Sequence, residues 1–276
     1  MSRADEIFKD NCRQILREGN SSVGQEVRAR WEDGTPAHTL KSFGLVNRYD
    51  LAAEFPVQTI RRVFLRKAVD ELLWIWQKKS NRVSELDSSI WDSWAGEDGT
   101  IGLAYGYQLG VKHRYAEGEF DQVDRVLYDL KHNPYSRRII TNMYVHADLH
   151  AMNLYPCAYS MTFNVTSGRL NALLQQRSQD MLVANHWNVT QYAVLTHMLA
   201  QVSGLAVGEF VHVIADAHIY DRHIPIVEEL LERPEYPAPK FVLNPEVEDF
   251  YDFVPTDAQL IDYKCGKIVR DIPVAI

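Results

Sequence analysis

Hydrophobic and polar residues alternate most regularly over residues 158–166. Every second position is apolar: Tyr159, Met161, Phe163 and Val165. This alternation predicts a strand with one buried face. Residues 166–169 are typical of a turn and residues 170–175 of a returning strand, which ends in the polar run 176–180. The predicted hairpin would bring that polar run back towards Cys157.

Apolar residues at spacings of three and four predict five helices. They cover residues up to about 19, 62–79, 121–132, 188–204 and 225–233. Further strands are expected through Phe43 and Val46 at a sheet edge and over 210–215 in a sheet centre. Another is expected through Ile140, Met143 and Val145, with Arg137 and Arg138 at its start. The segment after Pro237 is expected to form short extended pieces and turns.

The composition indicates one large domain spanning residues 1–276. With 46% hydrophobic residues the chain can bury a substantial core, and no Pro/Gly/Ser-rich linker divides it. A net charge of −8 and a pI near 5.7 argue against a surface that binds nucleic acid throughout. A local basic pocket stays open as an alternative.

Cysteine usage bears on the cellular compartment. The three cysteines, Cys12, Cys157 and Cys265, form no CxxC motif and cannot all pair, which favours a reducing compartment. No apolar run is long enough to span a bilayer, and residues 1–6 do not form a signal peptide. We therefore expect a cytoplasmic protein that has no membrane partner.

Cys157 has two interpretations. A lone cysteine is most often a packed core residue, because thiols are among the most buried side chains. A nucleophilic cysteine needs its thiolate, and a nearby guanidinium lowers the thiol pKa from its usual value of ~8.5. Arg177 is the candidate, because the hairpin would bring it towards Cys157.

Three other polar sites are left open by the pattern alone. Glu71 lies inside an apolar helical run, so it is either on the solvent side or buried with a raised pKa suited to proton transfer. Asn188 and Gln191 could form a capping box at a helix start, an alternative to a binding role for Asn188. Arg137 and Arg138 would point to opposite faces of a strand, unless they lie in a loop or serve a site shared between subunits.

No cofactor motif stands out in the sequence. His146 and His150 have the spacing of two metal ligands on a helix, but no third ligand is evident, so no metal is expected. The phosphate-binding P-loop and the dinucleotide fingerprint are absent, and nothing resembles a flavin site.

Several separated motifs together resemble the folate-dependent thymidylate synthases. In chain order they are Asp70-Glu71-Leu72-Leu73-Trp74, Ile90-Trp91-Asp92, Ala104-Tyr105-Gly106, Ser136-Arg137-Arg138-Ile139, Tyr155-Pro156-Cys157, Gln176-Arg177-Ser178 with Asp180, Asn188, Asp216-Ala217-His218-Ile219-Tyr220 and the terminal Pro273-Val274-Ala275-Ile276. The resemblance covers nearly the whole chain. It implies an α+β, three-layer α/β/α-type fold on a large mixed sheet, one face of which is buried in a homodimer.

The resemblance also implies a reaction, the reductive methylation of dUMP to dTMP. In this family the cysteine that matches Cys157 adds to carbon six of the pyrimidine. Carbon five then attacks the one-carbon unit of methylenetetrahydrofolate, which also supplies a hydride and leaves as dihydrofolate. The expected ligands are dUMP and reduced folate.

Three alternatives accompany this expectation. A hydroxymethylase of the same superfamily would act on dCMP or dUMP, but Asn188 disfavours it because that reaction usually has aspartate there. RNA binding through the arginines near Arg137 would be at most secondary, given the acidic net charge. A cysteine hydrolase would need a histidine base beside Cys157, and Ala158 supplies none.

The resemblance assigns the site residue by residue. Catalytic roles go to Cys157, Glu71, Tyr105, Arg177 and Asp180. Nucleotide-binding roles go to Arg28, Arg137, Arg138, Gln176, Arg177, Ser178, Asn188, His218 and Tyr220. Folate-binding roles go to Arg61, Trp91, Leu154, Asp180, Trp187 and Ile276.

Some details of this assignment differ from the family pattern or stay open. Arg137 and Arg138 would reach across from the second subunit, and Arg30 is an alternative to Arg28. Ala158 stands where many members carry histidine, and Trp187 ends a segment that replaces Gly-x-Pro-Phe. These two departures predict altered kinetics or altered antifolate sensitivity, with the same chemistry.

Overall fold

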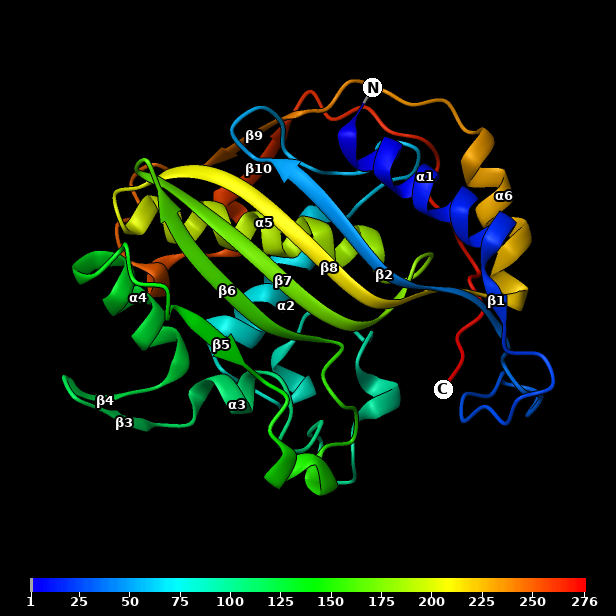
Figure 1. Ribbon diagram of the computed structural model, residues 1–276, viewed down its shortest axis with the longest axis horizontal. Coiled ribbons are helices and arrows are strands. Elements are labelled where there is room, and N and C mark those ends of the chain that lie inside the picture. Colours follow the sequence, from blue (N-terminus) through cyan, green and yellow to red (C-terminus); the bar gives the residue numbers. More distant parts are fainter. Residues whose placement is uncertain (1) are drawn as a thin grey trace.

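The structure, a computed structural model that describes residues 2–276, is built on a twisted six-stranded sheet (Figure 1). The strands lie in the order β1 (Asn20–Ser21), β2 (Thr39–Asp50), β8 (Ala206–Tyr220), β7 (Arg169–Asp180), β6 (Ala158–Thr166) and β5 (Ile140–Asn142). Among these described strands only β7 and β8 pair in parallel, so the sheet is mixed. Two small ribbons complete the strands: β3 (His113–Tyr115) with β4 (Gly118–Phe120), and β9 (Lys240–Leu243) with β10 (Ala258–Ile261).

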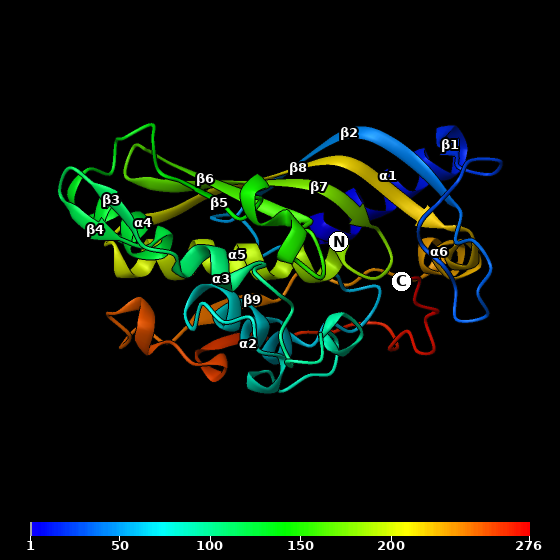
Figure 2. The same cartoon turned by 90° about the horizontal axis from the view of Figure 1, so that it is seen from below.

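Within residues 2–276, six α-helices accompany the sheet. They are α1 (Arg3–Glu18), α2 (Leu65–Trp76), α3 (Gly106–Gly110), α4 (Gln122–His132), α5 (Asn185–Val202) and α6 (Ile224–Glu232). Helix α5 lies directly against the sheet, and α2 lies on the far side of α5 (Figure 2). Because α5 is sandwiched in this way, buried residues occur all round it and it is not amphipathic.

The sheet has one covered and one uncovered face. In β2 the side chains of Leu45, Asn47 and Tyr49 are buried, whereas Val46 is 56% exposed and Arg48 is also exposed. Helices α1 and α5 both pack against the side that carries Leu45 and Tyr49. The expected α+β class and large mixed sheet are confirmed, with the helical layers on one side of the sheet and not on both.

Most predicted elements are present with shifted ends. The second helix ends at Trp76 and does not reach Lys79, because Lys79 has a φ of 53° that no right-handed helix can contain. The helix predicted over 188–204 begins three residues earlier, at Asn185. The backbone N–H of Asn188 therefore already donates to Ala184 O within the helix. The capping-box interpretation of Asn188 is therefore wrong.

The predicted hairpin is formed by β6 and β7. Its two-residue turn has positive φ at Ser167 (50°) and Gly168 (73°), the conformation that matches the twist of the strands it joins. An irregularity between Ala158 and Ser160 breaks the pairing at the start of β6. Strands β7 and β8 run beyond their predicted ends at residues 175 and 215, so that Asp180 pairs with His218 where the two strands end.

Candidate active site

Cys157 and Arg177 meet at the open end of the hairpin. Arg177 N donates to Cys157 O across the two strands at 2.9 Å, and Arg177 Nη2 lies 3.6 Å from Cys157 Sγ. The guanidinium also donates to Pro156 O at 3.0 Å and to Tyr155 O at 2.7 Å, which fixes it beside the thiol. The predicted approach of Arg177 to Cys157 is thus confirmed.

Burial and charge act on the Cys157 thiol in opposite directions. Burial raises its pKa, and Arg177, a hydrogen bond involving Tyr105, and Arg28 lower it, leaving the pKa above the ordinary value. The two arginines therefore lower the Cys157 pKa by less than burial raises it. Cys12, by contrast, is fully buried on α1, as the helical spacing predicts.

Tyr105 supports the backbone of Cys157. Its Oη accepts a 3.0 Å hydrogen bond from the Cys157 amide, and its ring packs edge-on against Trp91 at 5.0 Å. Tyr105 has a φ of 49°, an unusual conformation for a bulky residue, just before α3. The following Gly106 packs so tightly that a Cβ would lie 2.3 Å from Ser80 O. Close packing of this turn therefore holds the phenol against the cysteine.

Glu71 is the buried acid of the site. It is 5% exposed on α2, and Trp187 Nε1 donates to its Oε2 at 2.9 Å. Burial raises the pKa of Glu71 to about 7, although hydrogen bonds from Trp187 and Gln191 oppose the rise. Of the two interpretations left open by the sequence, the buried one is confirmed.

Asn188 lies in a network of amide side chains. Its Oδ1 accepts from Gln176 Nε2 at 3.1 Å and from Gln179 Nε2 at 3.4 Å, and its Nδ2 donates to Gln191 Oε1 at 3.3 Å. Gln176 also donates to Ser178 O at 3.1 Å. The orientation of the Asn188 amide is consequently set by its neighbours.

Asp180 is held by the protein itself at the end of β7. Its Oδ1 accepts from the amides of Leu182 at 2.8 Å and Val183 at 3.0 Å, and its Oδ2 lies 3.6 Å from His223 Nδ1. Burial would raise the pKa of Asp180, but His223, His218 and the Val183 amide hold it below the ordinary value. Asp180 is therefore an ionised group.

His223 links Asp180 to the C-terminal segment, because its Nε2 lies 2.8 Å from Pro273 O. Sequence reasoning missed this residue. The one available signal was its position three residues after the Asp216–Tyr220 motif, and nothing in the chain order indicates that Pro273 would lie beside it.

His218 and Tyr220 lie together at the end of β8. Their rings pack edge-on at 5.1 Å, and His218 Nδ1 is 2.9 Å from Asp216 Oδ1. Burial raises the pKa of Tyr220 to about 12, with Asp180 and Cys157 adding to the rise. Tyr220 is therefore close enough to Cys157 for the charge of one to change the pKa of the other.

The C-terminus is joined to the segment that carries Arg28. Arg30 N donates to Ile276 O at 2.8 Å, and Ile276 N donates to Arg30 O at 2.9 Å. The Arg30 guanidinium is engaged with Val27 O and Ala29 O, whereas the exposed Arg28 influences Cys157. The geometry favours Arg28 over Arg30 as the arginine that faces the site.

Other predicted site residues lie away from the Cys157 thiol or are buried in the protein interior. Arg137 and Arg138 are exposed in a turn before β5, and neither affects the Cys157 pKa within the chain. They are not on a strand, which removes the difficulty of opposite faces. Arg61 is buried, with its guanidinium against Leu182 O at 2.6 Å and against His186. Leu154 packs at the edge of the core.

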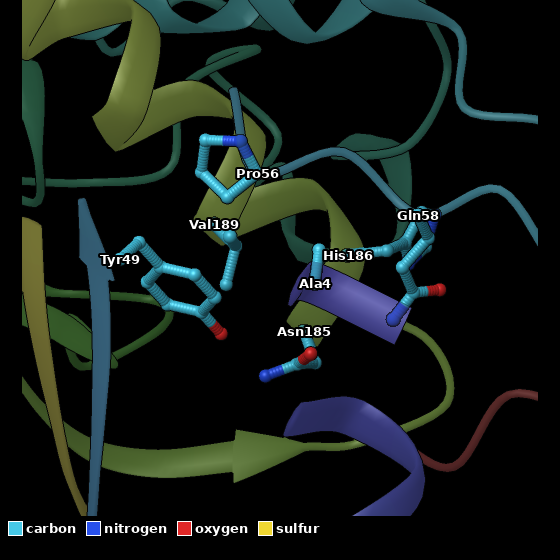
Figure 3. A pocket seen from close by; sticks show the side chains of 7 residues that line it. All are labelled: Ala4, Tyr49, Pro56, Gln58, Asn185, His186 and Val189. Carbon is cyan, nitrogen blue, oxygen red and sulfur yellow. The ribbon is translucent and has the colours of Figure 1, made fainter. Parts of the chain in front are cut away.

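A small pocket lies elsewhere, between α1, β2 and the start of α5 (Figure 3). Its lining residues are Ala4, Tyr49, Pro56, Gln58, Asn185, His186 and Val189. Within residues 2–276 the Gln58 side chain has no hydrogen-bond partner, and none of the lining residues is among the predicted site residues. The reactive groups lie outside this pocket.

The arrangement defines a class of enzyme. A part-buried thiol beside a fixed guanidinium is suited to nucleophilic attack, and a buried carboxyl with a pKa of about 7 is suited to proton transfer near neutral pH. The site thus fits covalent catalysis combined with general acid–base catalysis.

Comparison with known proteins identifies the family. The family model described as thymidylate synthase matches residues 6–275. The thymidylate synthase of Bacillus phage phi3T is 45% identical over 280 residues, covering 99% of this chain and 100% of that protein. Thymidylate synthase 1 of Bacillus subtilis (strain 168) is also 45% identical, with the same coverage. Among solved structures, thermostable thymidylate synthase A from Bacillus subtilis matches with a TM-score of 0.94 and 43% identity, covering 99% of each chain.

The chain belongs to the thymidylate synthase family. The resemblance that the separated motifs indicated is thereby confirmed over the full chain. No helix within residues 2–276 is both long enough and apolar enough to cross a membrane.

Proposed function

We propose that this protein catalyses the reductive methylation of dUMP to dTMP, with methylenetetrahydrofolate as the donor of both the carbon and the hydride. The observation that carries the proposal is the 3.6 Å approach of Arg177 Nη2 to Cys157 Sγ in a member of the thymidylate synthase family. Site residues come from positions as distant as Arg28 and Ile276, which supports a single domain over residues 1–276.

The reaction begins with the Cys157 thiolate, which forms a bond to carbon six of the pyrimidine and makes carbon five a nucleophile. Carbon five attacks the methylene carbon of the folate, and a base removes the proton from carbon five. The folate then leaves and returns a hydride to the methylene group, so that the folate is oxidised to dihydrofolate while the methylene becomes a methyl group. The sulfur–carbon bond breaks as dTMP forms.

Glu71 and Tyr105 serve the proton transfers. The pKa of Glu71, about 7, lets it take and return a proton near neutral pH. Tyr105 belongs to the network that removes the proton from carbon five, a role supported by the 3.0 Å hydrogen bond that its hydroxyl accepts from the Cys157 amide.

Nucleotide recognition is divided among three groups of residues. Asn188 accepts from the ring N–H of uracil and donates to the adjacent carbonyl, and Gln176 orients it. Arg28, Arg177 and Ser178 hold the phosphate. His218 and Tyr220 bind the sugar hydroxyl.

The folate lies against the C-terminal side of the site. Asp180 binds the pterin, and Trp91, Leu154 and Trp187 pack on it. Ile276 closes over the site with the C-terminus, which its pairing with Arg30 supports.

Arg61 differs from the other folate-binding residues. Its guanidinium donates to Leu182 O, so within this chain it braces the loop that follows Asp180. A contact with the folate's glutamate tail would require this side chain to turn outward.

The active unit in this proposal is a homodimer. The uncovered sheet face carries the exposed Val46, and the turn before β5 presents two exposed arginines, Arg137 and Arg138. Because neither arginine acts on Cys157 in its own chain, both are assigned to the phosphate in the partner's site.

The test is the growth of dihydrofolate absorbance when the protein is mixed with methylenetetrahydrofolate and either dUMP or dCMP. The proposal expects a signal with dUMP only. Hydroxymethylated product without dihydrofolate would instead identify the hydroxymethylase. The neutral amide of Asn188, with its Oδ1 already accepting from Gln176, favours uracil.

A further inference from the structure

His212 is a fully buried histidine in the centre of the sheet. It lies on β8, stacked on Phe210 with an interplanar angle of 18°, and no predicted site residue is its sequence neighbour. Its Nε2 lies 2.8 Å from Gln176 Oε1. This contact connects it to the amide that faces Asn188.

The hydrogen-bond partners fix which atoms donate along this chain of contacts. A backbone carbonyl only accepts, so the group of Gln176 that faces Ser178 O must be its NH₂. Gln176 Oε1 is therefore the atom that faces His212, and it requires a donor. His212 Nε2 must carry the proton, and burial, which lowers the His212 pKa to about 3, keeps the ring neutral.

The other ring nitrogen meets a complementary group. As an acceptor, His212 Nδ1 needs a donor, and Asn47 pairs directly with His212 across β2 and β8. Asn47 Oδ1 accepts from Asn11 Nδ2 at 3.0 Å, which turns the Asn47 NH₂ group away from α1. Among residues 2–276 both His212 Nδ1 and Asn47 Nδ2 lack a hydrogen-bond partner. The first is an acceptor and the second a donor, so the two unpaired atoms are complementary.

We infer that His212, held as the Nε2–H tautomer, is a positioning residue that sets substrate specificity: it fixes the Gln176 amide, and through Gln176 the Asn188 amide, in the orientation that selects uracil over cytosine. The inference rests on the proposed role of Asn188. Ala158, the residue opposite Gln176 on the other neighbouring strand, has no polar side chain, so it offers Gln176 no alternative donor.

Loss of the donor has a defined consequence. Gln176 Oε1 would be left buried without a partner, so the Gln176 side chain would be stabilised by leaving this position for one where a donor or water reaches it. Asn188 Oδ1 would then lose the Gln176 NH₂ that holds it, and the Asn188 amide could also adopt the orientation that exchanges its donor and acceptor at the pyrimidine. That exchanged pattern matches cytosine.

The test compares His212→Phe, His212→Gln and the matched control His197→Phe in the full-length protein. Phenylalanine keeps a ring for stacking on Phe210 but cannot donate, whereas glutamine places an NH₂ near the position of Nε2. His197 is a half-buried histidine, packed against Phe241 with the ring centroids 4.7 Å apart. The measurements are kcat/KM for dUMP and the inhibition constant of dCMP.

We expect His212→Phe to lower the selectivity for dUMP over dCMP by about tenfold or more, the order associated with one unpaired buried acceptor. His212→Gln should recover most of the selectivity, and His197→Phe should leave it unchanged. A His212→Phe protein that loses dUMP activity at constant selectivity would overturn the inference, because a merely structural residue would give that result. A wild-type protein inactive on dUMP would instead overturn the proposed function.

Discussion

The indole N–H of Trp187 donates a 2.9 Å hydrogen bond to the carboxylate of Glu71. One residue thus joins the wall assigned to the folate with the acid assigned to proton transfer. Since an N–H donor stabilises the charged carboxylate, Trp187 holds the Glu71 pKa lower than burial alone would place it, and the result is about 7. The departure from the family pattern at this position therefore bears on the chemistry of the site.

Trp187→Phe should move the pH dependence of the reaction. The substitution keeps an apolar ring but removes the donor, so the Glu71 pKa rises and the carboxylate forms only at higher pH. The ascending limb of kcat/KM against pH should shift to higher pH, with a larger loss of activity at pH 6 than at pH 8.5. An unshifted limb with uniformly lower activity would mean that Trp187 acts only in binding.

Arg177→Gln should make the Cys157 thiol harder to ionise. Removing the guanidinium 3.6 Å from Sγ removes the main influence that opposes burial, so the thiol pKa rises further. The pH dependence of alkylation at Cys157, followed by peptide mass spectrometry, measures this shift. Peptide-level analysis is needed because Cys265 is also partly accessible.

Arg177→Lys is the matched control for that experiment, because it keeps the charge but loses the forked contacts with Tyr155 O and Pro156 O. Its alkylation midpoint should lie between those of the wild type and Arg177→Gln. An identical midpoint in all three proteins would remove Arg177 from the activation of the thiol.

Gly106→Ala should destabilise the protein and impair the site together. The new Cβ would lie 2.3 Å from Ser80 O and 2.7 Å from Ser80 N, so the turn that carries Tyr105 must move. We expect a loss of about 1–3 kcal/mol, typical of overpacking. That corresponds to several degrees in Tm, because ~1 kcal/mol shifts a chain of this size by roughly 2–4 °C.

Gly110→Ala provides the comparison for Gly106→Ala within α3. There the nearest atom to the new Cβ would be Lys79 Cβ, at 3.1 Å, and the nearest backbone atom Lys79 O, at 3.8 Å, so a shift of a few tenths of an ångström relieves the contact. Its Tm and activity should stay close to those of the wild type. Equal effects of the two substitutions would contradict the account of the Tyr105 turn.

The shared phosphate site can be tested by mixing two inactive proteins. Cys157→Ala lacks the nucleophile, and the double variant Arg137→Ala with Arg138→Ala lacks the crossing arginines. A mixed dimer would contain one site with an intact cysteine and intact partner arginines, so exchange of subunits should restore activity towards a quarter of the wild-type value. No recovery in confirmed mixed dimers would place the arginines in the site of their own chain.

The hairpin shows how much of the fold local sequence can predict. Alternation over β6 and the turn at Ser167 are encoded by neighbouring residues, and both were predictable. The approach of Arg177 to Cys157 followed from that hairpin alone. Family motifs supplied the remaining candidate residues, such as His218 and Asn188, without their geometry.

The missed features depend on contacts distant in the chain. Glu71 was ambiguous because helix periodicity cannot show that α5 covers it. Asn188 and Gln191 have the spacing of a capping box, which predicts a helix start at Asn188, yet the helix begins three residues earlier. His212 looked like any residue of a buried strand, since its partner Gln176 lies 36 positions away.

The most direct measurement of the central claim is the release of tritium from dUMP labelled at carbon five, with wild type and Cys157→Ala compared in the presence of methylenetetrahydrofolate. If the Cys157 sulfur activates carbon five by adding to carbon six, wild type should release tritium to water in step with dihydrofolate formation, and Cys157→Ala should release essentially none. Release at a comparable rate by a folded Cys157→Ala protein would contradict the account.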